Sequence, residues 1–330
     1  MPDRKHEHIE FALASQTDKA EKDNRFIYEP LLSAHPEGLK PFQFLGKTLN
    51  TPIWASAMTG GTELSQKINE NIARACNHFG MGMGLGSCRS ILYNNDRFDD
   101  FNVRQYIGSG LPLFANLGIA QVDMLIGSKQ TSLIDGLVDK LKADGLIVHV
   151  NPLQEFFQPE GDTISRPPVD IIEELLDFVS FPVIVKEVGQ GMGYESLRRL
   201  VQLPVKAIEF GAFGGTNFSA LELKRNQLSG AELFKPFSFV GHTAEEMIGY
   251  LNNIVKESAV SDKEIIISGG VKTFLDGFYL MKKLLLPSVY GQASAILQYA
   301  SESYQALINY LSLQVKGLAL ANAFLTINQT

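Results

Sequence analysis

The amino-acid sequence predicts an α/β protein built as one (β/α)8 barrel, the TIM-barrel architecture, with a short N-terminal extension. Short apolar runs alternate with amphipathic stretches of helix length from about residue 50 to the end of the chain. There are about eight such runs, the number of strands that a closed parallel barrel requires. The length of 330 residues also suits one barrel, although division by a typical domain size would suggest two domains.

The predicted strands are these apolar runs, and the predicted helices are the amphipathic stretches between them. The strands are expected at Pro52–Ala57, Met81–Ser87, Leu113–Leu117, Gly145–Val150, Pro182–Val188, Ala207–Phe210, Glu264–Ser268 and Ser288–Gly291. The helices are expected at Leu64–Phe79, Val122–Leu141, Ile171–Val179, Glu245–Glu257 and Thr273–Leu284. Residues 1–30 form the expected extension and residues 31–330 the barrel.

An open, doubly wound sheet is the structural alternative, because it also alternates strands and helices. Polar or glycine residues stand near the end of nearly every predicted strand, at Thr59, Ser87, Asn116, His149, Lys186, Gly214, Gly269 and Gly291. An open sheet gathers such residues where its strand order reverses, whereas a barrel draws its site from the whole ring. This distribution favours the barrel. The long connections 151–168 and 211–238 are expected to be binding loops or lids.

Composition limits the classes of partner. The net charge of −7 and the pI near 5.5 argue against a nucleic-acid-binding face, which is normally basic. No apolar stretch is long enough to span a bilayer, and the polar N-terminus has no signal-peptide core. Cys76 and Cys88 lack a metal-binding spacing and are interpreted as free thiols. A cytoplasmic location is therefore expected.

A phosphate-binding site is predicted after the seventh and eighth strands. The tract Ser268-Gly269-Gly270-Val271-Lys272 follows one strand and opens a helix, so its backbone N–H groups could hold a phosphate. Gly291-Gln292-Ala293-Ser294 supplies the second half, in the region where barrels often bind phosphate. Tight turns that simply need glycine are the alternative interpretation.

Glycine also occupies every second position from Gly80 to Gly86. In a strand this spacing removes the side chains from one face. A planar cofactor or a neighbouring backbone could approach there, and packing alone is the alternative interpretation. The spacing differs from the dinucleotide-binding fingerprint.

Polar residues at the end of the fourth predicted strand suggest a site for a polar ligand and a cation. Strand alternation places His149 and Asn151 on one face, and the following loop adds Gln154 and Glu155. Magnesium suits this set, because it is commonly held by one or two carboxylates and the phosphates of the substrate. The alternatives are a structural histidine and a solvated loop carboxylate.

Two further groups of cations are candidates for binding anions. Lys186 ends the fifth predicted strand, so it would point into the barrel mouth, although a surface lysine just past the strand is possible. Arg4 and Lys5 belong to a basic cluster at the N-terminus, which by itself suggests only a solvated tail.

Several motifs in their order along the chain resemble the type 2 isopentenyl-diphosphate isomerase family. They are Arg4-Lys5 with Glu7-His8-Ile9, Ala57-Met58-Thr59-Gly60-Gly61, Gly86-Ser87 with Arg89, Ala115-Asn116-Leu117-Gly118, His149-Val150-Asn151 with Gln154-Glu155 and Pro159-Glu160-Gly161-Asp162, Lys186-Glu187-Val188-Gly189, Gly214-Gly215-Thr216 with Glu222, and Ser268-Gly269-Gly270-Val271. The resemblance extends from Arg4 to about Ser294. It implies FMN, Mg²⁺, NADPH as a reductant, an isoprenoid diphosphate substrate and a homo-oligomer.

The resemblance also implies a role for each matching residue. FMN would be held by Ala57, Met58, Thr59, Ser87, Asn116, Lys186, Thr216, Gly269, Gly270, Lys272, Ala293 and Ser294. The substrate would be held by Arg4, Lys5, Ser87, Arg89, His149, Asn151 and Gln154, and the metal by Glu155. The catalytic residues would be His149, Gln154 and Lys186. Cys88, Gly193 and Lys272 depart from the family pattern, in which Gln, Ser and Arg are usual.

The family implies isomerisation without net redox change, in which reduced flavin exchanges a proton with the alkene and Lys186 stabilises negative charge on the ring. Two alternatives remain. One is an FMN-dependent hydroxy-acid oxidoreductase on the same barrel. Against it stands the lack of an evident histidine-based constellation for abstracting a hydrogen α to a carboxylate. The other is a non-catalytic protein that binds flavin or polyprenyl phosphate.

Overall fold

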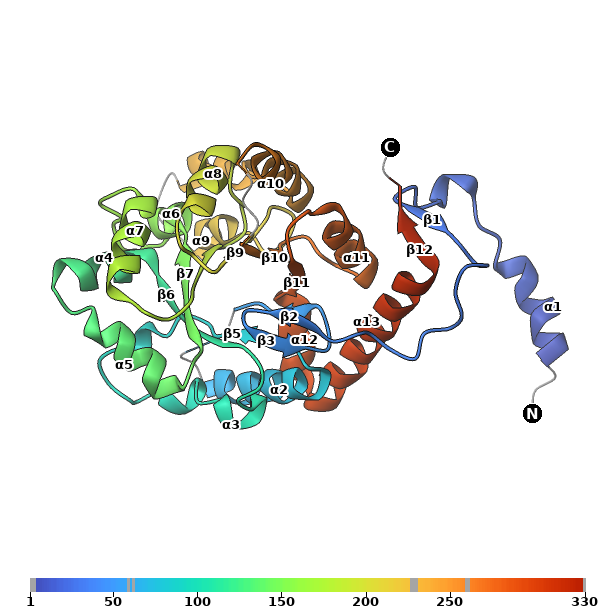
Figure 1. Cartoon of the computed structure of the whole chain (residues 1–330), viewed down its shortest axis with the longest axis horizontal. Coiled ribbons are helices and arrows are strands. Elements are labelled where there is room, and N and C mark those ends of the chain that lie inside the picture. The colour runs from blue at the N-terminus through green and yellow to red at the C-terminus, as the bar shows by residue number, and fades with distance from the viewer. Residues whose placement is uncertain (1–3, 58–59, 61–62, 226–230, 259–261, 329–330) are drawn as a thin grey trace.

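The computed structural model describes residues 4–57, 60, 63–225, 231–258 and 262–328. Eight parallel strands form a closed barrel in the order β10-β11-β4-β5-β6-β7-β8-β9, with helices around it (Figure 1). The strands are β4 (Ile53–Ala55), β5 (Gly82–Gly84), β6 (Leu113–Gly118), β7 (Gly145–Val150), β8 (Val183–Glu187), β9 (Ala207–Glu209), β10 (Glu264–Ser268) and β11 (Ser288–Gln292). Each lies within or beside a predicted strand. The predicted barrel is therefore confirmed, and the open sheet is excluded.

The helices confirm most of the prediction and correct it in one place. They are α2 (Glu63–Phe79), α3 (Arg104–Ile107), α4 (Ile119–Gly127), α5 (Ser132–Leu141), α6 (Pro152–Phe157), α7 (Pro168–Phe178), α8 (Tyr194–Gln202), α9 (Phe218–Arg225), α10 (Ala244–Ser258), α11 (Phe274–Lys283), α12 (Ser294–Glu302) and α13 (Tyr304–Phe324). The single helix expected at Val122–Leu141 is wrong, because α4 and α5 are separate. Lys129 between them has a φ of 56°, which a right-handed helix cannot accommodate.

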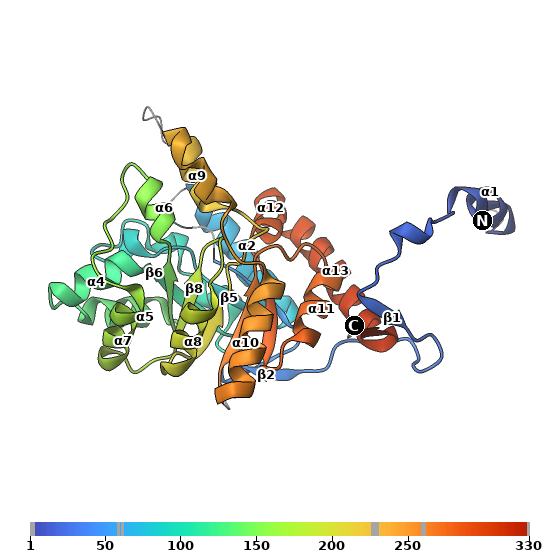
Figure 2. The same cartoon turned by 90° about the horizontal axis from the view of Figure 1, so that it is seen from above.

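The two long connections contain helices as well as loop. Helix α6 lies in the segment 151–168, and α9 and the 3-10 helix Ala231–Phe239 lie in the segment 211–238. Figure 2 shows α6 and α9 at the rim of the barrel. Both segments are therefore positioned beside the carboxyl ends of the strands.

The barrel interior is filled by apolar side chains and is closed at its amino end. Trp54, Phe114, Ile147, Ile184, Ala207, Ile266 and Val289 form one buried cluster with Phe44, Leu45 and Leu49. The last three come from the hairpin of β2 (Phe42–Phe44) and β3 (Lys47–Leu49). The backbone N–H of Leu45 donates to Oε1 of Glu264 at 2.8 Å, which fixes the hairpin against β10. The carboxyl end of the barrel is thus the end that can receive a ligand.

Packing explains two of the alternating glycines. A Cβ added at Gly82 would lie 2.1 Å from Cζ3 of Trp54, and one added at Gly84 would lie 2.5 Å from Cδ1 of Ile147. These two side chains are members of the interior cluster. Gly82 and Gly84 therefore make room for the barrel core, which is the packing alternative of the sequence interpretation.

The N-terminal extension is held to the barrel at one place. Strand β1 (Phe26–Tyr28) pairs antiparallel with β12 (Leu325–Ile327) near the C-terminus, and Arg25 Nη1 lies 2.8 Å from Oδ1 of Asp276 in α11. Helix α1 (Arg4–Ala14) stands apart from the barrel (Figures 1 and 2). No helix among the described residues is long and apolar enough to cross a membrane.

Candidate functional site

A narrow cavity of about 80 Å³ lies at the carboxyl end of the barrel. The ends of β4, β8, β9, β10 and β11 and the loops after them surround it. It brings together seven residues expected to bind the cofactor, namely Ala57, Lys186, Thr216, Gly269, Gly270, Ala293 and Ser294. Ser87, Asn116 and Lys272 do not line this cavity, and Met58 and Thr59 lie outside the described residues. The ring arrangement thus assembles most of the predicted set.

The glycine turn after β10 has a conformation that side chains rarely adopt. The φ angles of Gly269 and Gly270 are 90° and 75°. A Cβ added at Gly269 would lie 2.1 Å from the carbonyl oxygen of Ala212. Glycine is therefore required here by the backbone, and it also leaves the backbone accessible beside the cavity.

A buried ion pair lies in the wall of the cavity. Lys186 Nζ donates to the carbonyl oxygen of Glu187 at 2.7 Å and lies 3.8 Å from Oε1 of Glu209. Glu209 has no exposed surface, and its two carboxylate oxygens make no hydrogen bond among the described residues. The hydroxyl of Ser56 in the same cavity also lacks a partner there. A ligand with hydroxyl or N–H groups would satisfy these atoms.

Sequence reasoning missed Glu209. A detectable signal was present, because a carboxylate interrupts the otherwise apolar run Ala207–Phe210. A charge inside an apolar strand is expected to be paired or functional. Its partner could not be identified in the same way, because Lys186 lies on the neighbouring strand.

His149 is held as a neutral ring. Nδ2 of Asn116 donates to the carbonyl oxygen of Leu85 at 2.9 Å, so the Oδ1 atom of Asn116 is free to accept the Nδ1–H of His149 at 2.7 Å. Burial and the positive charge of Lys186 lower the pKa of His149 to about 4. The Nε2 atom then carries a lone pair at neutral pH. His149 can bind a ligand as a hydrogen-bond partner, but it is not a fixed cation.

The residues expected to bind metal and substrate form one hydrogen-bonded network at the rim. Nδ2 of Asn151 donates to Oε1 of Glu155 at 3.0 Å and to Oε1 of Gln154 at 3.2 Å. The backbone N–H of Asp162 donates to Oε2 of Glu155 at 2.8 Å. Asn151 is 3% exposed, and its Oδ1 atom has no partner among the described residues. Nowhere among the described residues do three His, Cys, Asp or Glu side chains gather as a metal site.

Arg89 is already paired in this structure. Its Nη1 atom lies 2.6 Å from Oδ2 of Asp162, and the same oxygen accepts Nε2 of Gln121 at 2.8 Å. Arg89 is therefore linked to Glu155 through Asp162. An anion would have to compete with Asp162 for the guanidinium group.

The N-terminal cations are not brought to the other predicted residues. Arg4 begins α1 and is exposed, and α1 lies far from α6 and α9 in Figures 1 and 2. The side chain of Lys5 is not among those that the structure describes. Ser87 is exposed just after β5, and Lys272 is exposed just before α11.

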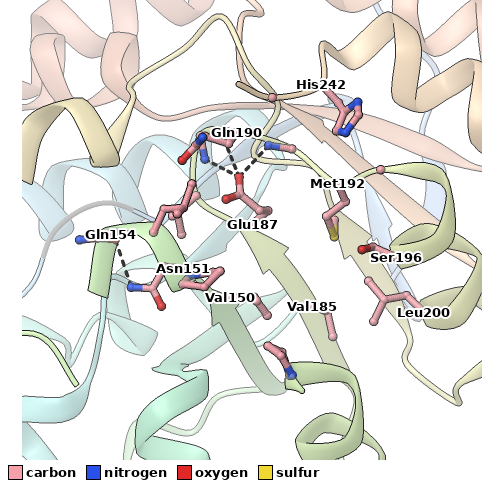
Figure 3. Close-up of a pocket in the computed structure, with 18 of the residues that line it drawn as sticks. Val150, Asn151, Gln154, Val185, Glu187, Gln190, Met192, Ser196, Leu200 and His242 are labelled. Atoms are coloured by element: carbon pink, nitrogen blue, oxygen red, sulfur yellow. Dashed lines mark hydrogen bonds between the residues drawn. The ribbon is translucent and has the colours of Figure 1, made fainter. Parts of the chain in front are cut away.

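A second and larger pocket of about 590 Å³ lies outside the barrel wall (Figure 3). It is bounded by the ends of β7 and β8 and by α7 and α8, and Asn151 and Gln154 line one end of it. Glu187 is one of its lining residues, and its Oε2 atom accepts the backbone N–H groups of Gly189, Gln190 and Gly191 at 2.6–2.8 Å. Burial raises the pKa of the Glu187 carboxyl, and these three hydrogen bonds oppose that shift. Nothing in the sequence spacing predicted this pocket.

Comparison with solved structures supports the fold. The recombinant flavin-binding domain of baker's yeast flavocytochrome b2 superposes with a TM-score of 0.63 at 14% identity, over 91% of this chain and 72% of that chain. A mandelate oxidase variant with the monooxide FMN adduct gives a TM-score of 0.56 at 13% identity, over 92% of this chain and 87% of that chain. At such identities the likeness concerns the fold. No protein-family model matches the chain.

Curated relatives are more similar. Isopentenyl-diphosphate delta-isomerase of Rickettsia prowazekii (strain Madrid E) is 32% identical over 324 residues, which cover 96% of this chain and 92% of the relative. The enzyme of the same name from Rickettsia peacockii (strain Rustic) is 33% identical over 325 residues, with the same two coverages. The family resemblance predicted from the motifs is thus confirmed along almost the whole chain. The chain belongs to the isopentenyl-diphosphate delta-isomerase family.

Proposed function

We propose that this protein converts isopentenyl diphosphate into dimethylallyl diphosphate with bound FMN and Mg²⁺ and without net redox change. The observation that carries the proposal is the cavity at the barrel mouth. There, residues that the family motifs assign to FMN surround the buried oxygens of Glu209 and Ser56, which lack partners among the described residues. Relatives named isopentenyl-diphosphate delta-isomerase align with almost the whole chain.

The residues of this cavity fit FMN chemically. The hydroxyl groups and ring N–H of FMN can donate to Glu209 and Ser56, and the turn at Gly269 and Gly270 offers backbone N–H groups to its phosphate. Reduced FMN, when bound, supplies an acid/base group that can exchange a proton with the alkene.

The protein side chains then position and neutralise charge. Lys186 Nζ, beside the cavity, stabilises negative charge on the cofactor, and Glu209 compensates the ammonium charge within the wall. His149 remains hydrogen-bonded to Asn116, which directs its Nε2 lone pair away from that residue. Burial and the positive charge of Lys186 lower the pKa of His149 to about 4, so the ring is neutral at neutral pH.

The rim network holds the diphosphate in this proposal. Glu155 binds Mg²⁺ together with the phosphate oxygens of the substrate, as one carboxylate commonly does. Asn151 Oδ1, buried and without a partner among the described residues, would accept a hydrogen bond from a donor on the bound ligand. Gln154 and Arg89 bind the diphosphate, and Arg89 exchanges Asp162 for it.

We further propose that NADPH reduces the flavin and that the protein is a cytoplasmic homo-oligomer. Buried free thiols at Cys76 and Cys88 suit a reducing compartment. Exposed apolar side chains on α1, at Ile9, Phe11 and Leu13, favour contact with another chain.

An anaerobic assay tests the reaction type. Oxidised enzyme with Mg²⁺ should be nearly inactive, and dithionite should activate it without any nicotinamide. With NADPH, many equivalents of dimethylallyl diphosphate should form for each NADPH oxidised, because the flavin needs to be reduced once. A ratio near one to one would instead support the FMN-dependent oxidoreductase. Bound FMN and Mg²⁺ without turnover would support a non-catalytic binding protein.

A further inference from the structure

We propose that the pocket outside the barrel wall binds the chain of prenyl diphosphates longer than the five-carbon substrate, with the diphosphate at the end formed by Asn151 and Gln154. Such compounds would compete with the substrate for its site. This inference rests on the proposed function, because it assumes that these two residues face an isoprenoid diphosphate.

The first argument is the size of the pocket. Its volume of about 590 Å³ is within the range of roughly 300–1,000 Å³ that encloses drug-sized ligands. A five-carbon chain would leave most of this space unfilled. The space therefore suits a ligand several times longer than the substrate.

The second argument is the chemical character of the walls. Val150 and Val185 face outward from β7 and β8. Ile147 lies three residues before Val150 and Ile184 one residue before Val185, and both isoleucines belong to the barrel interior, so alternation places the valines on the opposite face. Further apolar side chains come from α7, α8, α9 and the loops, namely Val169, Ile172, Leu200, Met192, Phe218 and Val240. Branched aliphatic walls on opposite sides suit a branched hydrocarbon chain, whose burial is favourable in proportion to its area.

The third argument is that the pocket adjoins the candidate active site. Val188, Gly189 and Phe218 line both the pocket and the cavity at the barrel mouth. Asn151 and Gln154, which line one end of the pocket, are hydrogen-bonded to each other within the Glu155 network. Figure 3 shows these two residues at one end and Ser196 and Leu200 at the other. A diphosphate bound beside Glu155 would thus have an apolar space within reach of its chain.

The charges determine the orientation of the ligand. Arg199 and Glu195 line the far end and are separated by four residues on α8. The carboxylate of Glu195 is paired with Arg198, 2.6 Å away, so the guanidinium of Arg199 is the alternative site for a diphosphate at the far end. The near end is favoured because it adjoins the proposed Mg²⁺ site, where a divalent cation would hold the phosphate oxygens.

The test uses FMN-loaded, reduced enzyme with Mg²⁺ and a series of inhibitors: inorganic, dimethylallyl, geranyl and farnesyl diphosphate. The inhibition constant should fall at least about tenfold from the five-carbon to the fifteen-carbon compound, because each added unit buries more apolar carbon. Inhibition should be competitive with isopentenyl diphosphate. Equal constants along the series, or non-competitive inhibition that Arg199→Gln abolishes, would overturn the proposal.

Two substitutions fill the pocket from opposite walls. Val169→Trp on α7 and Ser196→Trp on α8 should each remove the gain with chain length and leave kcat and KM for isopentenyl diphosphate within about twofold. Asp177→Trp is the matched control, since it adds the same side chain to an exposed position of α7 that does not line the pocket. It should keep the wild-type series, and thermal unfolding should show that all three variants are folded.

The same measurements separate this inference from the proposed function. If the wild type isomerises isopentenyl diphosphate but does not distinguish chain lengths, only the inference is refuted. If it does not isomerise, calorimetric titration with farnesyl diphosphate still reports on the pocket. Binding that Val169→Trp and Ser196→Trp do not weaken would refute the pocket assignment.

Discussion

Lys186 and Glu209 form a charge pair whose two members are not equally replaceable. Lys186 also donates a hydrogen bond to the carbonyl oxygen of Glu187, a contact that does not involve Glu209. Glu209 is wholly buried, and Lys186 at 3.8 Å is the cation paired with it among the described residues. Removing one partner of a buried pair leaves an uncompensated charge.

Lys186→Met should therefore lower the free energy of unfolding of the FMN-free protein by about 3–5 kcal/mol. The double variant Lys186→Met/Glu209→Gln should recover a large part of this loss, because no buried carboxylate is left unpaired. Urea unfolding of the two single variants and the double variant completes the cycle. Strictly additive losses would show that the two side chains do not interact.

The neutral His149 ring makes folding sensitive to acid. Its pKa is about 4 in the folded protein and close to 6.5 in an unfolded chain, so protons bind the unfolded state more readily. The contribution of the neutral ring to the free energy of unfolding is fully present above about pH 6.5 and is lost as the pH falls from about 6.5 to 4.

His149→Gln should weaken this pH dependence by roughly 3 kcal/mol between pH 7 and pH 4. Denaturant unfolding at several pH values, without ligand, measures it for the wild type and the variant. The same slope in both proteins would mean that another group carries the acid sensitivity. Addition of diphosphate should reduce the effect in the wild type, because an anion near the ring favours its protonated form.

At the level of single elements, the turn after β10 depends on backbone geometry. Gly269→Ala would place a Cβ 2.1 Å from the Ala212 carbonyl oxygen and would force a φ of 90° on alanine. We expect a lower melting temperature and at least about tenfold weaker FMN binding, measured by recovery of flavin fluorescence, because strain of this kind costs of order 1–3 kcal/mol.

Gly136→Ala is the control for the same chemical change. Gly136 is exposed within α5, and an added Cβ there meets nothing within 4 Å. This variant should be as stable as the wild type or more stable by about 0.5–1 kcal/mol, because alanine favours helix. Unchanged FMN affinity in Gly269→Ala would remove the turn from the proposed cofactor site.

At the scale of the whole molecule, the N-terminal extension can be separated from folding. Helix α1 is exposed and stands away from the barrel, while β1 and Arg25 attach the later part of the extension. Deleting residues 1–8 should leave the melting temperature nearly unchanged and should raise the KM for isopentenyl diphosphate at least about tenfold.

The same deletion tests whether the basic cluster binds substrate or is a solvated tail. Because Arg4 is remote from the other candidate substrate residues of its own chain, its contribution requires either movement of the extension or a neighbouring chain. The substitution Arg4→Gln/Lys5→Gln in the full-length chain is the control, since it removes the charge and keeps the helix. An unchanged KM in both proteins would show that the cluster is a solvated tail.

The sequence alone determined the barrel and the composition of its mouth. Eight apolar runs separated by helices correspond to the observed strands from β4 to β11, because strand periodicity and length are local properties of the chain. Polar residues after those runs meet because parallel strands of a barrel end on one face. Lys186, Thr216, Gly269 and Ser294 line one cavity for this reason.

Only the tertiary structure decided how these groups interact. The 3.8 Å between Lys186 and Glu209 depends on the register of two strands, and the neutral state of His149 depends on burial and on Asn116. The pairing of Phe26 with Ile327 and the pocket between the strand and helix layers join segments distant in the sequence. A local pattern contains the preference of each segment for helix or strand, whereas distances, burial and proton positions arise from contacts made when the chain closes on itself.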